Sequence, residues 1–387
     1  MKFTVPVQSI INPLVQVASI CAKNTSNPDD LTKFLLVDVK HTALTLTGTD
    51  NSVQMQAVVP LSENSCDSEG TFLIGSDRIA AFVKSLNMAD DVSFDLDEEE
   101  EMLAVVSGKS DFKIRVRLMA ADTVFPVFKE EEGAPEPQQF LIEESKLRYM
   151  LDKSVFCVSH ENYRDYLKGV RFEITGDELV LYALDGHRMA ALETKLPAAV
   201  ENEIKFLMTL RGVTELQKLL SNSSKEQLKF TVSDKFISTQ IGFYTISNRL
   251  LTCKYPNVAA VLPKMCSPEL HVPLEELKND VRRVSLFSNK RLNHINLTFT
   301  YNKLQLFSQN SDHEIGRAVI DIDYPEQDGY REINLNAEYL KDFLNAIDTS
   351  DVVFGFSPPY QNTLIRQRDE WNENGVRVRY VVSHIMV

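Results

Sequence analysis

The sequence has little that would crosslink the chain or anchor it in a membrane. Its 387 residues include only five cysteines, which are scattered, odd in number and never spaced as C-x-x-C. We therefore expect reduced thiols, as in cytoplasmic proteins, and no disulfide framework. No stretch approaches the roughly 18 apolar residues of a transmembrane helix, and the segment "MKFTVPVQSIINPLVQV" is periodic rather than continuously apolar. Neither a membrane span nor a signal peptide is expected.

Motifs for metals, cofactors and nucleotides are also missing. The seven histidines show no H-x-x-x-H pair and no Cys/His ligand spacing, so we expect no metal and no cofactor. The chain has no G-x-G-x-x-G loop and no G-x-S-x-G elbow. The tetrad "SGKS" from Ser107 resembles the end of a phosphate-binding loop, but Leu103 stands where the first glycine is required. Residue order alone leaves open a Ser–His–Asp triad assembled in space.

The chain has no excess of basic residues either. Its net charge is −14, and an acidic protein is not an obvious partner for nucleic acid because phosphates repel it. Net charge says little about local patches, however. A composition of 43% hydrophobic and 25% charged residues is typical of a globular protein, and the length predicts two or three domains.

A faint internal repeat of about 130 residues runs through the chain. Each copy begins with an amphipathic helix, reaches an alternating strand, continues with a second helix and ends in β-rich sequence. The predicted helices span residues 7–20, 76–86, 143–156, 209–220, 273–287 and 336–347, and the alternating strands span 43–50, 178–185 and 303–310. We therefore predict three similar α+β domains, 1–128, 129–262 and 263–387, each with two helices on antiparallel sheet.

Local signals support these helices and the segments between them. Ser76, followed by Asp77, and Asn336 are candidate N-caps because their side chains can accept from the first free backbone amides. The linkers 129–139 and 262–269 contain proline. The acidic run that begins at Asp95 is expected to form a solvated hairpin tip.

Basic residues are concentrated on one side of the predicted helices. In 273–287, Lys278 and Arg282 lie one turn apart, away from the apolar stripe. These cations are either ordinary solvated surface or a positive track that contacts phosphates without distinguishing bases. Tyr163 and Tyr166 could add stacking on exposed bases.

The stretch "LYALDGHRMAAL" contains the one candidate for catalysis, Asp185 with His187. Asp, Gly and His are also the residues of a tight turn, in which Asp accepts from backbone amides and Gly186 adopts a positive φ. Three interpretations stay open from the residues alone: a structural turn, a surface that binds a ligand or peptide, and a catalytic pair.

The chain resembles the bacterial β sliding clamps, the processivity subunits of DNA polymerase III. The similarity extends over essentially the whole chain, through "MKFTV", "LTLTGTD", "YLKGVRFE", "LDGHRMA", "YPNVAAVLPK", "LFSNKR" and "YVV" in this order. It implies a non-catalytic clamp, a head-to-tail homodimer that closes as a ring around duplex DNA, with helices facing the hole. It also implies an interface between the first and third domains, with Phe112, Ile114, Leu286 and Phe287 as apolar contacts; ordinary core is the alternative for these four residues.

The resemblance implies two further surfaces. The DNA-facing residues would be Lys23, Arg78, Tyr166, Arg211, Lys278, Arg282, Lys290 and Arg291. A peptide groove that takes polymerases and the clamp loader would be lined by Leu167, Gly186, His187, Arg188, Met189, Pro256, Val261, Val381 and Val382, with Asn336, Tyr339, His384 and Ile385 close by.

This sequence departs from the family pattern at several of these positions. Its early loop "AKNTSNPDDLTKF" offers only Lys23, Asp165 precedes Tyr166, Ala260 replaces an expected arginine, and the tail is "SHIMV". We expect a cytoplasmic sliding clamp with an altered peptide preference. The alternatives are a diverged copy with other partners, a scaffold that forms no ring, and a hydrolase that uses Asp185 and His187.

Overall fold

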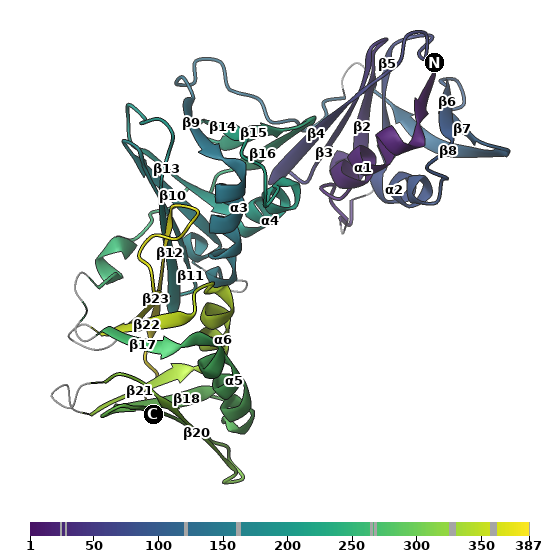
Figure 1. Cartoon of the computed structure of the whole chain (residues 1–387). Coiled ribbons are helices and arrows are strands. Elements are labelled where there is room, and N and C mark those ends of the chain that lie inside the picture. The colour runs from purple at the N-terminus through teal and green to yellow at the C-terminus, as the bar shows by residue number, and fades with distance from the viewer. Residues whose placement is uncertain are drawn as a thin grey trace. The chain divides into compact units, whose positions relative to one another are not determined.

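The computed structural model describes the chain apart from residues 24, 28, 120–122, 160–163, 264–265, 267–268, 325–329, 357–361 and 387. The described residues form two compact units (Figure 1). Unit 1 comprises Met1–Leu141, Thr214–Leu220 and Gln227–Leu250, and unit 2 comprises Ile142–Val213, Ser221–Glu226 and Leu251–Val387.

Unit 1 is built on one antiparallel sheet. From edge to edge its strands are β1 (Lys2–Pro6), β6 (Asp91–Asp97), β7 (Met102–Ser107), β8 (Ser110–Leu118), β5 (Gly70–Gly75), β2 (Phe34–Val39), β3 (Ala43–Thr49), β4 (Val53–Pro60), β16 (Tyr244–Arg249), β15 (Phe236–Ile241), β14 (Gln227–Val232) and β9 (Gln138–Glu143). Helices α1 (Val7–Ala18) and α2 (Ser76–Lys84) pack side by side, and α1 covers β3 and β4 (Figure 1). Helix α4 (Leu210–Leu219) contributes residues to both units.

Unit 2 contains two antiparallel sheets. The larger has the order β13 (Ile204–Thr209), β10 (Gly169–Thr175), β11 (Glu178–Leu184), β12 (Arg188–Lys195), β24 (Val376–Ser383), β23 (Asn362–Gln367), β22 (Asp351–Phe356) and β17 (Glu269–Pro273). The smaller has the order β20 (Ile315–Asp321), β19 (Lys303–Gln309), β18 (His294–Thr300) and β21 (Arg331–Asn336). The helices of this unit are α3 (Glu144–Asp152), α5 (Leu274–Val284) and α6 (Ala337–Ala346), and α5 packs against α6 and β20.

Short 3-10 turns complete the secondary structure. They are η1 (Leu31–Lys33), η2 (Val155–Cys157), η3 (Asp165–Leu167), η4 (Val258–Val261) and η5 (Ser285–Phe287). No helix in the described part of the chain combines the length and hydropathy that a membrane span requires.

The strand order confirms the threefold repeat. The neighbours β1-β6-β7-β8 correspond to β9-β14-β15-β16 and to β17-β22-β23-β24, and β5-β2-β3-β4 correspond to β13-β10-β11-β12 and to β21-β18-β19-β20. The α+β architecture is therefore the predicted one. Two pairings, β4 with β16 and β12 with β24, join one copy to the next, and the boundaries at 128/129 and 262/263 stay predictions.

The predicted helices are confirmed, but only one of the two predicted caps is. Asn336 precedes α6, and its side chain accepts from the amides of Glu338 and Tyr339 at 2.9 and 3.2 Å. The cap at Ser76 is wrong, because the N-cap of α2 is Gly75, with no side-chain hydrogen bond. Ser76 is buried and donates to the Lys33 carbonyl at 2.8 Å instead, which ties α2 to η1.

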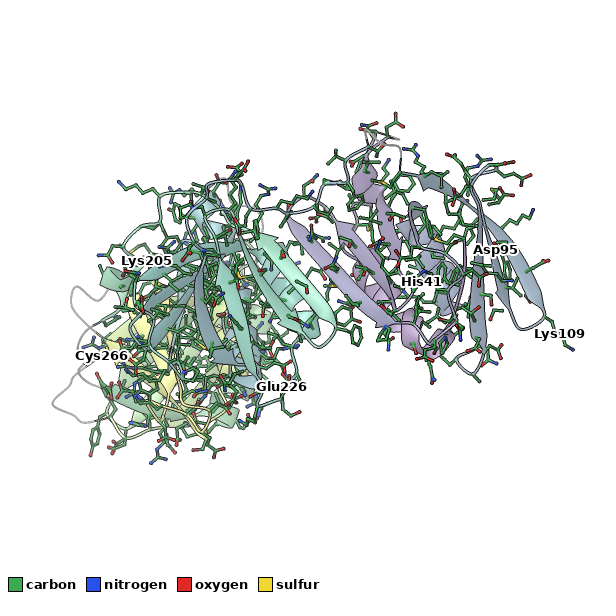
Figure 2. All side chains as sticks on the ribbon, turned by 90° about the horizontal axis from the view of Figure 1, so that it is seen from above. His41, Asp95, Lys109, Lys205, Glu226 and Cys266 are labelled. Carbon is green, nitrogen blue, oxygen red and sulfur yellow. The ribbon has the colours of Figure 1, made fainter. Side chains whose placement is uncertain are left out.

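The polarity of the elements follows the sequence pattern. In α5 the apolar positions Leu274, Leu277, Val281 and Val284 are buried, whereas Arg282 is exposed. The acidic run forms the turn between β6 and β7, with Asp95 in β6 (Figure 2). The "SGKS" tetrad is the tight β7–β8 turn, in which Gly108 has a φ of +59°.

Candidate functional site

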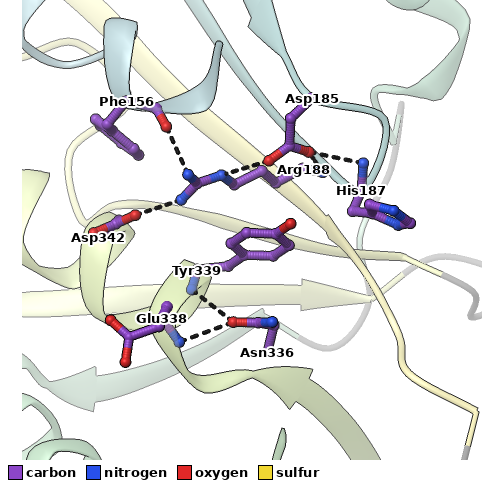
Figure 3. Close-up of polar contacts among 8 residues, drawn as sticks. All are labelled: Phe156, Asp185, His187, Arg188, Asn336, Glu338, Tyr339 and Asp342. Carbon is purple, nitrogen blue, oxygen red and sulfur yellow. Dashed lines mark hydrogen bonds and ion pairs between the residues drawn. The ribbon is translucent and has the colours of Figure 1, made fainter. Parts of the chain in front are cut away.

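The turn between β11 and β12 is held by the Asp185 carboxylate. Its Oδ1 accepts from the backbone amides of His187 and Arg188 at 2.9 and 3.0 Å (Figure 3). Gly186 has a φ of +101°, a conformation that other residues adopt only with strain. These contacts satisfy the backbone groups of the turn and leave the His187 side chain exposed.

Arg188 joins this turn to η2 and to α6. Its Nε donates to Asp185 Oδ2 at 3.0 Å, its Nη1 to Asp342 Oδ2 at 2.5 Å and its Nη2 to the Phe156 carbonyl at 2.6 Å (Figure 3). The guanidinium also lies 4.3 Å from the centroid of the Tyr339 ring. Burial opposes the charge of Arg188, but its hydrogen bond to Asp342 and the neighbouring negative charges raise its pKa above the ordinary value.

The geometry of this turn offers no support for a catalytic Asp–His pair. Asp185 bonds the backbone amide of His187, and the imidazole points away from the carboxylate (Figure 3). A general base needs an orienting contact to its ring. Among the described residues, no group of three or more His, Cys, Asp or Glu side chains is arranged to hold a metal ion.

The pairing of β12 with β24 separates the predicted groove residues onto two faces. Met189 lies opposite Val381, and Arg188 lies opposite Val382. Since side chains alternate along a strand, the first pair faces one side of the sheet and the second faces the other. Met189 and Val381 belong to a buried apolar cluster with Tyr182, Ala191, Val258 and Leu364, on which half-buried apolar side chains such as Leu184 and Leu262 pack. Peptide contacts by Arg188 and Val382 stay predictions, and their side chains lie on the opposite face from this cluster.

The remaining predicted groove residues lie around this turn and this cluster. Leu167 is buried, with its Cδ1 3.8 Å from the position of a Cβ on Gly186. Pro256 and Val261 are exposed on either side of Val258, which is part of the cluster. Asn336 and Tyr339 lie at the start of α6, next to Arg188 (Figure 3).

The C-terminal segment is attached to the same region. The Ser383 amide donates to the His187 carbonyl at 2.9 Å, and the Ile385 amide donates to the Asn334 carbonyl at 2.8 Å. His384 Nε2 lies 2.7 Å from Thr363 Oγ1 on β23. Burial, and secondarily the charge of Arg331, lower the pKa of His384 below its ordinary value of 6.5.

A pH dependence of stability follows from His384. Its pKa is lower in the folded than in the unfolded chain, so the unfolded chain binds the proton more readily below about pH 6.5 and stability falls on acidification. We expect the Tm of His384→Gln to fall less than that of the unsubstituted protein between about pH 7 and pH 5. Differential scanning fluorimetry across this range measures the difference, and parallel curves would contradict the prediction. His294, whose pKa burial also lowers, is present in both proteins.

Four of the eight predicted DNA-facing residues line cavities. Lys23 and Arg78 line a cavity of about 470 Å³ in unit 1, and Lys278 and Arg282 line one of about 240 Å³ between α5 and α6. Lys278 is paired with Glu275 at 3.2 Å. The other four residues do not line these two cavities. Arg211 is exposed on α4, and Lys290 and Arg291 are exposed after η5. Tyr166 is half-buried, with its ring centroid 6.2 Å from that of Tyr255. Tyr163 lies outside the described residues.

The predicted interface residues differ in exposure. Phe112 on β8 and Leu286 in η5 are 42% and 78% exposed, which does not fit ordinary core. Ile114 is buried, which fits the alternative of core. Phe287 is half-buried and lines a cavity with β20.

Sequence reasoning missed the partners of Arg188 and a group of arginines on the larger sheet of unit 2. Asp342 lies 154 positions from Arg188, and no local spacing indicates such a contact. The arginines could have been predicted to share a face, because the alternation in "VRVRYVV" places Arg377 and Arg379 on the same side of the strand as Val381.

Comparison with known proteins gives consistent matches along the chain. Family models of the DNA polymerase III beta subunit match its N-terminal domain at residues 1–124, its central domain at 141–257 and its C-terminal domain at 259–378. The beta sliding clamp of Pseudomonas aeruginosa is 29% identical over 95% of this chain and 96% of its own length. Two solved sliding clamps bound to griselimycin, from Pseudomonas aeruginosa and Bartonella birtlesii, cover 100% of both chains with TM-scores of 0.90 and 0.88 and identities of 26% and 25%.

These matches agree with the threefold strand order. All three domains are matched in sequence, in the order of the repeat, and the solved structures reproduce the whole fold. The chain therefore belongs to the family of DNA polymerase III beta subunits, the sliding clamps, which are processivity factors of DNA replication and not enzymes.

Proposed function

We propose that this clamp acts in the cytoplasm as a head-to-tail homodimer that closes around duplex DNA and tethers polymerases and the clamp loader through short peptides. The observation that carries this proposal is the pair of free strand edges at the two ends of the repeat. Within the described part of the chain, β20 is an edge strand, and residues 110–115 of β8 pair with β7 alone.

The internal junctions indicate how these edges are used. Strands β4 and β12 pair with β16 and β24, and in the repeat β20 is the counterpart of β4 and β12, while β8 is the counterpart of β16 and β24. A third junction of the same kind therefore needs β20 of one subunit and β8 of the next. Such a contact is heterologous and closes when two subunits complete a ring. The exposed Phe112 and Leu286 lie next to these edges.

Retention by a closed ring suits an acidic protein. A ring stays on DNA by topology, so each phosphate contact can be weak, and weak contacts without base recognition permit sliding. Exposed cations on or beside the helices, such as Arg78 and Arg282, supply such contacts.

The peptide-docking role is supported by the apolar cluster around Met189 and Val381. Aliphatic and aromatic side chains of a linear peptide would pack on the half-buried Leu184 and Leu262, which cover this cluster. Relatives solved with griselimycin support a ligand site in this fold. Ala260 lies between Val258 of the cluster and Leu262, which packs on it, and Ser383 and His384 follow Val381 closely in the chain. These departures from the family pattern would alter peptide preference.

The test of the whole proposal is topological. The protein is loaded onto nicked circular DNA by a matched clamp loader, and the circle is then cut. We expect bound protein to leave the linear DNA while staying on the uncut circle. Protein that never loads, or that stays on linear DNA with free ends, would refute the ring.

Replacing His187 by alanine tests the docking role against the hydrolase alternative. Because His187 is exposed and makes no ring contact to Asp185, we expect an unchanged Tm and a peptide Kd roughly five- to tenfold higher, a loss of about 1 kcal/mol. Fluorescence anisotropy with a labelled apolar peptide measures the Kd. The matched control is His41→Ala in unit 1 (Figure 2), which should leave the Kd unchanged. An unchanged Kd in His187→Ala would contradict the docking role.

The phosphate contacts predict a specific salt response. Arg78→Gln should reduce the slope of log affinity against log salt by about 0.9, the value expected for one lost phosphate contact. Binding to a primed hairpin is followed by anisotropy over a range of salt concentrations. Lys109→Gln, at the exposed β7–β8 turn (Figure 2), is the control with the same change of charge. Equal slopes for the two variants would show that Arg78 makes no phosphate contact.

A further inference from the structure

One face of the sheet β11-β12-β24-β23 changes from apolar to charged along its strands. Opposed residues on this face form three rows across the sheet, because directly paired residues of antiparallel strands point to the same side. The rows are Leu184, Met189, Val381 and Leu364; then Tyr182, Ala191, Arg379 and Arg366; then Val180, Glu193 and Arg377. The apolar cluster proposed to dock peptides is therefore followed, two residues further along each strand, by arginines.

The charged rows form the wall of a cavity of about 720 Å³. The cavity is also lined by Leu262, Pro263 and Cys266 (Cys266 is labelled in Figure 2). Tyr182 and Leu364 belong both to this cavity and to the apolar cluster, and Leu262 and Cys266 line the cavity and pack against the cluster. The cavity is thus continuous with the docking cluster.

The buried part of this cavity has an excess of positive charge. We call Arg366, Arg377 and Arg379 the arginine floor; their side chains are 17%, 27% and 19% exposed. Among the described residues that line the cavity, the one carboxylate at similar depth is Glu193, which is 15% exposed, whereas Glu178 is 53% exposed and pairs with Lys195. Glu269 and Glu370, which also pair with the floor, are 41% and 57% exposed, so solvent screens those pairs more strongly.

The pairing of two members of the floor, Arg377 and Arg379, is incomplete. Arg377 Nη1 and Arg379 Nη2 share a single oxygen, Glu193 Oε2, at 3.3 and 3.0 Å. The Nε atoms of both arginines are buried and have no acceptor within the part of the chain that the structure describes. Arg366 donates to Glu269 Oε2 at 2.7 Å and to the Gln367 and Arg368 carbonyls at 2.8 and 2.9 Å. It lies directly opposite Arg379 in the strand register, an arrangement of like charges that a further anion would stabilise.

We propose that the arginine floor binds an acidic side chain of the partner peptide, outside the apolar motif that packs on Met189 and Val381. The inference rests on the proposed docking role of that cluster and adds a specificity determinant to it. Two residues of an extended strand span about 6.6 Å, so the guanidinium row is one pleat repeat from the apolar row. A Glu or Asp about two to four positions from an apolar anchor residue in an extended peptide reaches it. A carboxylate accepts bidentate hydrogen bonds from guanidinium, which supplies both charge and geometry.

The test compares peptides that share one apolar core. A fluorescein-labelled core peptide is extended at either end by Glu-Glu, Gln-Gln or Lys-Lys, and the Kd of each is measured with the full-length protein. We expect one of the two Glu-Glu extensions to bind about five- to tenfold more tightly than its Gln-Gln counterpart, and the gain to shrink as salt increases. The sole tryptophan, Trp371, lies 5.8 Å from the guanidinium of Arg377, so its fluorescence reports occupancy of the floor.

Variants separate the floor from the rim. Arg379→Gln and Arg366→Gln should each remove most of the gain from Glu-Glu while leaving the Kd of the unextended core peptide unchanged. Arg368→Gln is the control, because Arg368 lines the same cavity but is 58% exposed and pairs with Asp351; it should keep the gain. A Tm measurement identifies any variant that fails to fold. The salt dependence of the Glu-Glu gain, measured with the unsubstituted protein, tests the proposal without any variant.

The outcomes are distinct. Equal affinity for Glu-Glu and Gln-Gln at both ends, or tighter binding of Lys-Lys, overturns the assignment. A response of Trp371 to inorganic phosphate without any gain from Glu-Glu would make the floor a site for free anions and would also overturn it. Failure of the core peptide itself to bind would refute the proposed docking role instead.

Discussion

Leu286→Asp is expected to separate the dimer and abolish loading onto circular DNA. Leu286 is 78% exposed in the single chain, next to the edge strand β20, so the substitution should not unfold the subunit. In the proposed interface its carboxylate would be buried among apolar groups without a partner, at a cost of several kcal/mol. A loss of about 2.7 kcal/mol already raises the dimer Kd a hundredfold.

Sedimentation equilibrium at micromolar concentration, followed by the loading assay, measures this effect. Val124→Asp is the matched control, since Val124 is 77% exposed in unit 1 and lies outside the strands. It introduces the same charge at equal exposure and should leave the dimer intact. A Leu286→Asp protein that stays dimeric and loads normally would show that the interface lies elsewhere.

The second large effect is expected from Arg188→Ala. The side chains of Arg188 and Asp185 are 11% and 13% exposed, and the substitution leaves the Asp185 and Asp342 carboxylates and the Phe156 carbonyl without their shared donor. Breaking a buried ion pair by removing one partner costs about 3–5 kcal/mol. For a domain of this size, 3 kcal/mol corresponds to roughly 6–12 °C in Tm. We also expect weaker peptide binding, because Arg188 fixes the turn to α6.

Thermal unfolding monitored by circular dichroism measures the change in Tm, and fluorescence anisotropy measures the peptide Kd. Lys341→Ala is the control on α6, because among the described residues Lys341 pairs with Glu338 alone, which is 60% exposed. Its Tm should change by less than about 2 °C. Arg188→Lys keeps the charge but cannot reproduce the three-way contact, so it should recover only part of the loss. A Tm change below 2 °C in Arg188→Ala would mean that the network contributes little net stability.

The helices and the repeat could be predicted because they depend on local periodicity. The apolar spacing in α5 is sufficient to define its buried side. Local signals were less reliable for caps: Asn336 accepts from two amides as predicted, whereas Ser76 donates to a carbonyl 43 positions away. A serine hydroxyl can serve either purpose, and the neighbouring chain decides which.

The candidate site was only partly predictable. The Asp185 turn follows from three adjacent residues and their conformational preferences. That Arg188 and Val382 face away from Met189 and Val381 follows from alternation as well, but only once the pairing of β12 with β24 is known.

By itself the sequence determined the local elements, the threefold α+β repeat and the polar turn at Asp185, since each depends on residues within a few positions of one another. Only the tertiary structure decided which strands meet across copies. The register between β12 and β24 places Met189 beside Val381 and Glu193 beside Arg377, and it assembles both the docking cluster and the arginine floor. Such a register is set by burial and hydrogen bonding between segments nearly two hundred positions apart, and no short-range pattern contains that information.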